Sequence, residues 1–248
     1  MKTILITGTS SGYGLETARH FHEQGWRVVA TMRNPRPAAL PASDRLTVVP
    51  LDVTDAGSIA ACVAAAGPID VLVNNAGIGM GGAFEATPME HIRKAFETNT
   101  FGTMAMTQAV FPGMREWGGG VVVNVTSSTT LAPHPYFTVY TASKTAIEGL
   151  AEALAAELDP FGIRVKLVIP GHAPTTRFAE NTTVPVLDLI PEAYASHAQA
   201  VFEDLARPGP KTRESDLAEA IWQAVNDTSA RLRFPAGADA AALWDARH

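Results

Sequence analysis

Two side chains with complementary chemistry stand four positions apart in the segment Tyr140-Thr-Ala-Ser-Lys144. Residues at this spacing lie on one face of a helix, so a phenol and an ammonium group are expected side by side. A neighbouring positive charge favours the phenolate and would lower a tyrosine pKa that is otherwise about 10. The pair therefore predicts a catalytic acid and base. Alone it is a weak indication, because most such pairs are solvated surface neighbours.

A serine earlier in the chain strengthens this prediction. Ser127 follows residues 121–125, a mostly β-branched run that begins after three consecutive glycines and has the composition of a buried strand. Parallel α/β sheets bind ligands beyond the carboxyl ends of their strands. We therefore expect the Ser127 hydroxyl to lie in the same site as the Tyr140 phenol.

The start of the chain predicts a cofactor site. Residues 3–6 have a buried-strand pattern and residues 15–24 a helical one, and the turn between them contains Gly8, Gly12 and Gly14. Glycines let the backbone approach a pyrophosphate, which the N-terminus of the next helix attracts. Many glycine-rich turns are ordinary loops, but a turn between the first strand and the first helix favours dinucleotide binding.

In order and spacing these segments resemble the short-chain dehydrogenase/reductase family, in particular its single-domain branch. The resemblance covers roughly residues 1–175, and residues 233–239 more loosely resemble hydroxysteroid and retinol dehydrogenases. The motifs that carry it are Thr-Gly-x-x-x-Gly-x-Gly at 7–14, Asn74-Asn75-Ala76-Gly77, Asn99, Ser127, Tyr140 with Lys144, and Pro170-Gly171.

The resemblance implies a catalytic tetrad of Asn99, Ser127, Tyr140 and Lys144. In this family a nicotinamide exchanges hydride with a carbonyl or alcohol carbon, the tyrosine transfers the proton, and the serine hydrogen-bonds the same oxygen. The lysine also holds the ribose, and the asparagine binds a water that links the lysine to solvent. The implied cofactor contacts are Gly8, Ser10, Ser11, Gly12, Tyr13, Gly14, Arg33, Asp52, Val53, Asn75, Ala76, Gly77, Tyr140, Lys144, Pro170, Gly171 and Thr175.

The end of the second predicted strand bears on the choice of cofactor. An acidic side chain there binds the ribose hydroxyls of NAD, and a basic one suits the 2′-phosphate of NADP. This chain has Met32 where NAD-dependent relatives usually carry Asp, followed by Arg33 and, nearby, Arg36. NADP(H) is favoured, and NAD(H) stays possible because both arginines could be solvated loop charges.

Alternating strand and helix patterns predict one α/β domain over residues 1–248, a doubly wound parallel sheet (Rossmann fold) with helices on both faces. The later strands are expected at 27–31, 46–50, 71–74, 121–125, 164–169 and 231–234. The later helices are expected at 58–66, 89–117, 140–158 and 214–226. Asn99 is a poor helix former, and the resemblance implies a kink there in the 89–117 helix.

Residues 176–212 interrupt this alternation, and we interpret them as a substrate lid. Their apolar residues could cover an apolar, small-to-medium ketone, aldehyde or alcohol, or could pack only against the domain. These residues are Phe178, Val184, Val186, Leu187, Leu189, Ile190, Tyr194 and Phe202. Phe84, His134 and Phe137 are expected to complete the pocket.

Composition excludes several other classes of protein. The net charge of -6 and the dispersed basic residues disfavour nucleic acid and membrane surfaces as partners. No signal peptide or transmembrane-length segment is visible, so a cytoplasmic protein is expected. Cys62, the only cysteine, is expected to be a small core residue. His20 and His22 do not share a helix face, so no metal site is expected.

A stripe of small residues on the Tyr140 helix permits close approach to another element. The stripe consists of Ala142, Ala146, Gly149, Ala153 and Ala156. It could pack on the protein's own sheet or on a partner helix. The resemblance favours the partner, and a homodimer or homotetramer is expected.

Two alternatives and two departures from the family pattern stay open. A 3-oxoacyl-carrier-protein reductase would need a concentrated basic patch to dock its acidic carrier, and a non-catalytic cofactor-binding sensor would not need an intact tetrad. Thr130 replaces a glycine common in relatives and could narrow the floor of the pocket. Lys166 replaces a frequent asparagine and is expected to change only the surface.

Overall fold

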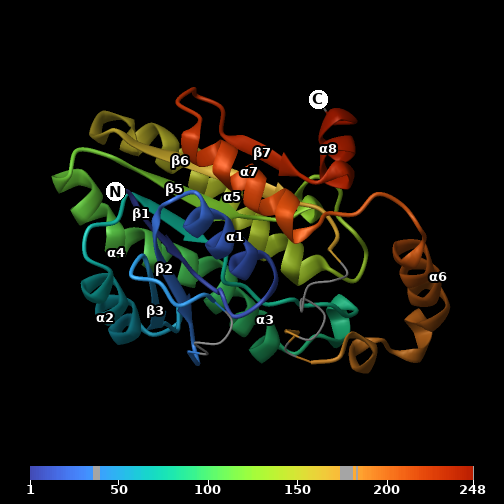
Figure 1. Ribbon diagram of the computed structural model, residues 1–248. Coiled ribbons are helices and arrows are strands. Elements are labelled where there is room, and N and C mark those ends of the chain that lie inside the picture. Colours follow the sequence, from blue (N-terminus) through green and yellow to red (C-terminus); the bar gives the residue numbers. More distant parts are fainter. Residues whose placement is uncertain (36–39, 174–180, 183, 248) are drawn as a thin grey trace.

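One parallel sheet of seven strands lies at the centre of the molecule (Figure 1). The computed structural model describes residues 1–35, 40–173, 181–182 and 184–247. The strands are β1 (Thr3–Ile6), β2 (Arg27–Met32), β3 (Leu46–Pro50), β4 (Val71–Asn74), β5 (Gly120–Val125), β6 (Ile163–Pro170) and β7 (Arg233–Ala236), in the order β3-β2-β1-β4-β5-β6-β7. All carboxyl ends therefore share one edge, and the order reverses at β1, where such sheets bind ligands. The predicted fold class is confirmed.

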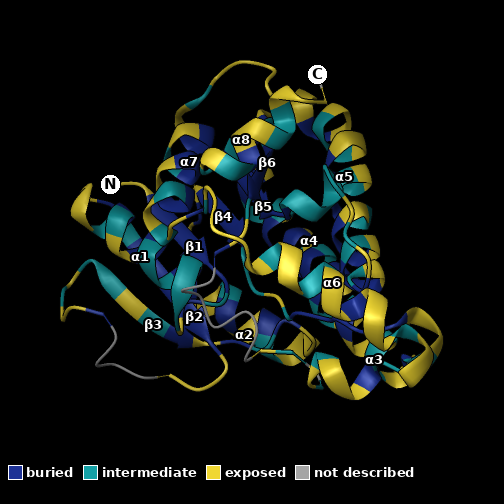
Figure 2. Ribbon diagram, turned by 90° about the vertical axis from the view of Figure 1, so that its right-hand side faces the viewer, coloured by how far each residue is buried: buried dark blue, intermediate teal, exposed yellow. Residues whose placement is uncertain are grey.

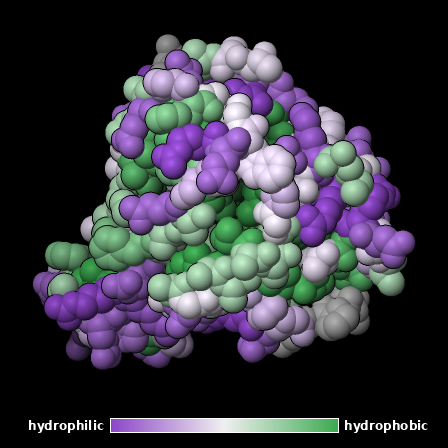
Figure 3. Space-filling model, turned by 90° about the vertical axis from the view of Figure 1, so that its left-hand side faces the viewer, coloured by the Kyte–Doolittle hydropathy of each residue, from purple (hydrophilic) through white to green (hydrophobic). Residues whose placement is uncertain are grey.

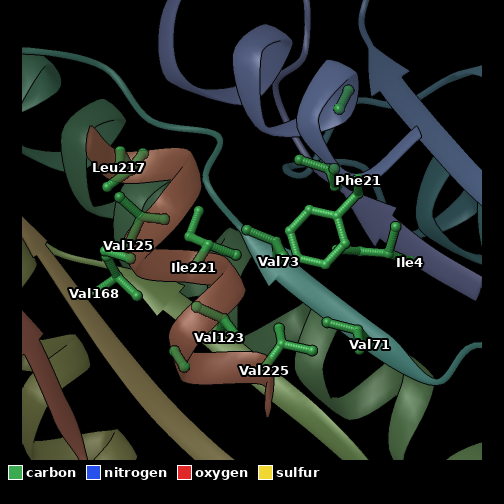
Figure 4. Packing of buried hydrophobic residues seen from close by; sticks show 14 of the residues in the cluster. Ile4, Phe21, Val71, Val73, Val123, Val125, Val168, Leu217, Ile221 and Val225 are labelled. Carbon is green, nitrogen blue, oxygen red and sulfur yellow. The ribbon is translucent and has the colours of Figure 1, made fainter. Parts of the chain in front are cut away.

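Helices cover both faces of the sheet. One face is covered by α1 (Gly12–Glu23) and α7 (Glu214–Asn226), and the other by α2 (Ala56–Ala66), α4 (Gly102–Glu116) and α5 (Thr138–Leu158). In Figure 4, Phe21 of α1 and Ile221 of α7 pack with the strand residues Ile4, Val73 and Val123. The strands are apolar on both sides, as a sheet buried on two faces requires. Figure 2 shows the central strands β1 and β4 in dark blue, whereas the edge strand β3 is partly exposed.

The predicted helix over 89–117 is interrupted. It consists of α3 (Met89–Phe96), a π-helical turn over Glu97–Phe101 and then α4. Asn99 lies inside that turn, so the regular α-helix is interrupted at the residue where a kink was predicted. A π-turn adds a residue to one helical turn, and such turns often occur at functional sites.

Several elements of the C-terminal half differ from the predictions. β7 begins at Arg233, and the short helix α8 (Ala238–Asp245), which follows Gly237, was not predicted. Within the lid segment, 3-10 turns η6 (Val186–Leu189) and η7 (Glu192–Tyr194) precede α6 (Ala195–Ala206). In Figure 1, α6 lies at the side of the molecule, away from the sheet. Further 3-10 turns are η2 (Phe84–Ala86), η4 (Ser128–Thr130) and η5 (Asp159–Phe161).

Lys166 corrects an expectation, because it lies in the core and not on the surface. Its side chain is only 2% exposed, since β6 is flanked by β5 and β7 and covered by helices. The ammonium donates to Asp227 Oδ1 at 3.0 Å, to the Ser229 carbonyl at 2.9 Å and to the Arg231 carbonyl at 2.6 Å. Lys166 therefore ties the connection between α7 and β7 to β6.

Further features of the surface and the core concern the membrane, metal and cysteine expectations drawn from the composition. On the face shown in Figure 3, hydrophobic and hydrophilic side chains are mixed. None of the helices in the described residues is long and apolar enough to cross a membrane. Within the same part of the chain, no group of three or more His, Cys, Asp or Glu residues could hold a metal ion. Cys62 is fully buried, and burial raises the pKa of its thiol to about 11.

Candidate active site

A cavity of about 1190 Å³ opens at the carboxyl edge of the sheet and brings most of the predicted residues together. It is lined by Ser127, Tyr140 and Lys144 and by the predicted cofactor contacts Gly8, Ser10, Ser11, Gly12, Tyr13, Gly14, Arg33, Asp52, Val53, Asn75, Ala76, Gly77, Pro170 and Gly171. Thr175, Arg36 and Phe178 lie outside the described residues. Asn99 lies just behind the lining, fully buried.

Ser127 and Tyr140 meet through their hydroxyl groups. Ser127 follows β5 in extended conformation, and its oxygen accepts a hydrogen bond from the Thr129 N–H at 3.3 Å. Its side chain also hydrogen-bonds Tyr140, which lowers the pKa of the phenol. Burial has the larger effect and raises that pKa to about 12. The phenol is therefore held in its protonated form.

Lys144 lies beside Tyr140, as predicted, but does not make the phenol easier to ionise. Its ammonium is 6.0 Å from the centre of the Tyr140 ring and donates instead to the Val125 carbonyl at 3.0 Å. Burial lowers the pKa of Lys144 to about 8, because desolvation disfavours the charged ammonium. The expected direction of the Tyr140 shift is therefore wrong for this arrangement, because desolvation of the buried phenol dominates.

Asn99 braces the loop that follows β4. Its amide oxygen accepts from the Ile78 N–H at 2.8 Å, and its amide nitrogen donates to the Ile78 carbonyl at 3.0 Å and to Ser143 Oγ at 3.1 Å. A methyl group built on Gly77 would lie 3.2 Å from Asn99 Oδ1 and 3.5 Å from Lys144 Nζ. The π-turn therefore places Asn99 close to Lys144.

The glycine turn is packed against the Asn75 loop. Gly8 has a φ of 74°, which glycine adopts without strain. A side chain at Gly14 would meet the Gly8 carbonyl at 2.3 Å and the Asn75 amide nitrogen at 2.5 Å. That nitrogen donates to the carbonyls of Thr7 at 2.9 Å and Gly8 at 3.1 Å. These contacts hold an open backbone surface at the N-terminus of α1.

The far end of the cavity contains Arg33 and Asp52. Asp52 Oδ1 accepts from both the Thr54 N–H at 2.9 Å and the Thr54 hydroxyl at 2.7 Å. These bonds, and to a smaller extent the Arg33 charge, lower the pKa of Asp52 despite its partial burial. Asp52 thus stabilises a turn through Thr54 while it lines the cavity. Arg33 is exposed, and Met32 is buried beside it.

Thr130 does not belong to the lining found for this cavity, so it does not narrow the pocket floor as expected. Its hydroxyl lies 2.8 Å from the Ser127 carbonyl and 2.5 Å from Glu148 Oε1 on α5. Glu148 in turn pairs with Arg233 at 3.5 Å. The loop that carries Ser127 is therefore fastened to the helix that carries Tyr140.

The predicted lid residues divide into two groups. Val186 lines the cavity, together with Pro185, Leu205, His134 and Phe137. Leu189 and Ile190, with Tyr194 and Phe202, instead pack against the domain around Met80, Ala83 and Tyr136, which is the alternative left open above. Phe84 is 62% exposed and is not part of the described lining.

Tyr136 is a residue that the sequence did not indicate. Its φ is 67°, a left-handed conformation that tyrosine rarely adopts. Its buried hydroxyl lies 2.5 Å from His197 Nδ1 of α6, and its ring packs against Phe202 at 5.7 Å between centroids. Tyr136 thus joins the lid to the loop before α5. No spacing or motif marks it.

Comparisons with known proteins agree with this geometry. A family model described as short chain dehydrogenase matches residues 2–184. The chain is 37% identical over 253 residues to the uncharacterized oxidoreductase YusZ of Bacillus subtilis, covering 95% of this chain and 89% of the relative. It is 40% identical over 250 residues to retinol dehydrogenase 8 of Homo sapiens, covering 94% and 80%. The chain belongs to the short-chain dehydrogenase family, and its likeness to a retinol dehydrogenase is confirmed.

Solved structures extend the likeness to the fold. A short-chain dehydrogenase from Streptomyces avermitilis superposes with a TM-score of 0.81 at 35% identity, covering 99% of this chain and 91% of that one. A 3-ketoacyl-(acyl-carrier-protein) reductase from Brucella melitensis complexed with NADH has a TM-score of 0.79 at 27% identity, covering 94% and 96%. Serine dehydrogenase complexed with NADP+ has a TM-score of 0.79 at 26% identity, covering 95% and 94%. Similar proteins thus bind either nicotinamide cofactor.

Proposed function

We propose that this protein is an NADP(H)-dependent oxidoreductase that interconverts ketones or aldehydes with alcohols. One arrangement carries the proposal: the Tyr140 phenol, hydrogen-bonded to Ser127, shares a cavity with Lys144 and the glycine turn. A nicotinamide bound there supplies a hydride to a carbonyl carbon or accepts one from an alcohol carbon. Gly8 and Gly14 fit such a cofactor, because only glycine allows their close packing against Ala76 and Asn75, and both line the cavity at the N-terminus of α1, where a pyrophosphate would bind.

Tyr140 provides the proton in this proposal. A pKa raised to about 12 keeps the phenol protonated at neutral pH, so in reduction it donates its proton to the carbonyl oxygen. Ser127 donates its own hydroxyl hydrogen to the same oxygen and holds it beside Tyr140. The phenolate left by the Tyr140 donation is the base for the reverse reaction: in oxidation it accepts the alcohol proton and the phenol is restored. Lys144 lies in the same cavity and would hold the ribose of the cofactor. Asn99 supports the site in both reaction directions through its hydrogen bonds with Ile78 and Ser143.

The preference for NADP(H) rests on the end of β2. Arg33 is exposed in the cavity and can pair with a 2′-phosphate. Met32 offers no acceptor to ribose hydroxyls.

The substrate we propose is apolar and of small to medium size. Phe137, Val186 and Leu205 give the cavity an apolar wall near Tyr140, and Val186 and Leu205 come from the proposed lid over 176–212. His134 and His172 contribute polar side chains to the lining of the same cavity. Such a pocket suits an apolar body with few hydrogen-bonding groups.

A 3-oxoacyl-carrier-protein reductase is a second candidate, favoured by the likeness to the Brucella melitensis reductase. The net charge of -6 disfavours an acidic carrier as partner. The absorbance of NADPH separates the candidates when it is followed with free ketones and with carrier-linked 3-oxoacyl substrates. The proposal requires turnover of free ketones. Activity only on carrier-linked substrates, or cofactor binding without any turnover, would contradict it.

The proposed assembly is a homodimer or homotetramer. Ala142, Gly149, Ala153 and Ala156 are exposed on α5 and do not pack on the sheet. This exposure supports the alternative in which a partner helix covers the stripe.

A further inference from the structure

The loop that follows β6 is held by residues from far along the chain. Pro170, Gly171 and His172 line the cavity opposite the glycine turn. The Gly171 N–H donates to Thr212 Oγ1 at 2.9 Å, and the Thr212 N–H donates to the His172 carbonyl at 3.0 Å. Thr212 is 1% exposed. It is also the last residue of the proposed lid segment, so the end of that segment contacts this loop.

Asp239 of α8 completes the contact from the other side. Its Oδ2 accepts from the His172 N–H at 2.7 Å, and its Oδ1 accepts from the Thr212 hydroxyl at 2.7 Å. Hydrogen bonds to a carboxylate are short and about twice as strong as neutral ones. A single carboxylate thus joins the cavity loop to the end of the lid segment.

Two glycines make this packing possible. A methyl group at Gly171 would lie 2.2 Å from the Asp239 carboxylate, and one at Gly237 would lie 2.2 Å from Thr212 Oγ1. Gly237 also has a φ of 87°, so it starts α8 in a conformation that favours glycine. The backbone on both sides is therefore shaped around Thr212 and Asp239.

The same loop also contacts the glycine turn. The Tyr13 hydroxyl donates to the Gly171 carbonyl at 3.5 Å. Burial, and then the Asp239 charge, raise the pKa of Tyr13, so its hydroxyl keeps the hydrogen that this bond needs. Gly171 is thus fixed through its N–H by Thr212 and through its carbonyl by Tyr13.

We propose that Thr212 and Asp239 are positioning residues that fix the Gly171–His172 loop against the cofactor. This inference rests on the proposed function, since it assigns the loop to the nicotinamide side of the cavity. Helix α8 contains none of the predicted site residues, and the proposal gives it a role in cofactor binding.

Matched variants test the role of the two side chains. Thr212→Val keeps the shape of the buried residue but removes the hydroxyl, and Thr212→Ser keeps the hydroxyl. Asp239→Ala removes both acceptor oxygens. In Asp239→Asn, the amide oxygen can accept from the His172 N–H, and the amide nitrogen can donate to the Thr212 oxygen. The Thr212 hydroxyl would then donate its hydrogen to the Ala236 carbonyl. Asp245→Ala, at an exposed position of the same helix, is the control.

Two readouts judge the proposal. In titrations with NADPH, we expect Thr212→Val and Asp239→Ala to raise Kd by about tenfold or more, with KM for the ketone within about twofold, and Thr212→Ser and Asp239→Asn to bind nearly as wild type. Hydrogen exchange without nucleotide should show the Gly171 and His172 amides exchanging about tenfold faster only in the first two variants. A wild type that binds no nicotinamide cofactor contradicts the proposed function. Unchanged loop exchange in folded Thr212→Val and Asp239→Ala, or equal damage in the conservative variants, overturns this inference.

Discussion

The Lys144 ammonium donates to the Val125 carbonyl at 3.0 Å, so helix α5 is fastened to the end of strand β5, from which the chain continues to Ser127. This hydrogen bond thus joins the two elements that carry the Ser127 and Tyr140 hydroxyls, in addition to the contact between Thr130 and Glu148. Lys144 is only 6% exposed, and the free-energy cost of burying its ammonium group can be measured.

Replacing Lys144 by Met should change how stability depends on pH. Folding lowers the pKa of Lys144 from 10.5 to about 8, so between these values the unfolded chain binds more protons and stability rises with pH. Relative to Lys144→Met, the wild type should gain about 3 kcal/mol of unfolding free energy between pH 7.5 and 10.5, an order-of-magnitude figure. Urea unfolding without nucleotide, at several pH values, measures this difference. Parallel curves for the two proteins would contradict a lowered pKa.

The exposed Arg33 should decide between the two cofactors. Arg33→Met removes the charge available to a 2′-phosphate, and we expect kcat/KM for NADPH to fall about tenfold or more while the value for NADH changes little. Met32→Asp should shift the preference further toward NADH. Arg115→Met, on the last turn of α4, is the control for loss of a charge. A wild type that prefers NADH would refute the assignment.

Val186, and not the neighbouring Leu187, should select substrates by size. Val186 lines the cavity near Phe137, whereas Leu187 is 73% exposed and lies outside that lining. Val186→Phe is expected to lower kcat/KM for bulky ketones about tenfold more than for acetone-sized ones. Leu187→Phe should leave both unchanged. Equal losses for all substrate sizes in Val186→Phe would show that the segment is scaffold.

Gly149 offers a direct test of assembly. A side chain built there meets no atom within 4 Å in the described residues, so Gly149→Ala should stabilise a lone subunit by about 0.5–1 kcal/mol through helix propensity. If a partner helix packs on this face, the wild type should be an oligomer and the Gly149→Glu variant should be separate subunits of 26.2 kDa. Analytical ultracentrifugation at micromolar concentration distinguishes the states. A monomeric wild type would refute the proposed assembly.

The sequence predicted those features that depend on local patterns. β3, β4 and α7 have the predicted bounds, because each combines a clear apolar period with distinct ends. Ser127, Tyr140 and Lys144 line one cavity as predicted, because Ser127 follows a strand and the other two share one helix face, whereas Asn99 was indicated only by the family resemblance. The π-turn at Asn99 appeared only as a kink, since a poor helix former does not specify which turn replaces the helix.

Features that depend on distant contacts could not be read from the chain. Lys166 looked like a surface residue, because only the fold brings Asp227, Ser229 and Arg231 to its ammonium. The direction of the Tyr140 pKa shift was also missed, because spacing shows that Lys144 is near but does not show how deeply the phenol is buried. The contacts of Asp239 could not be predicted for the same reason, because its partners His172 and Thr212 lie in other segments of the chain.

The most direct measurement of the proposed chemistry compares wild type with Tyr140→Phe under saturating NADPH and a free ketone. The variant keeps the ring and its packing but has no proton to give, so kcat should fall by about 10²–10⁴-fold. Its Kd for NADPH should stay within about twofold of the wild-type value, and Tyr194→Phe, which removes a phenol from the lid, should keep near-normal kcat for a small ketone. A Tyr140→Phe protein that reduces the ketone at close to the wild-type rate would contradict the assignment of Tyr140 as the proton donor.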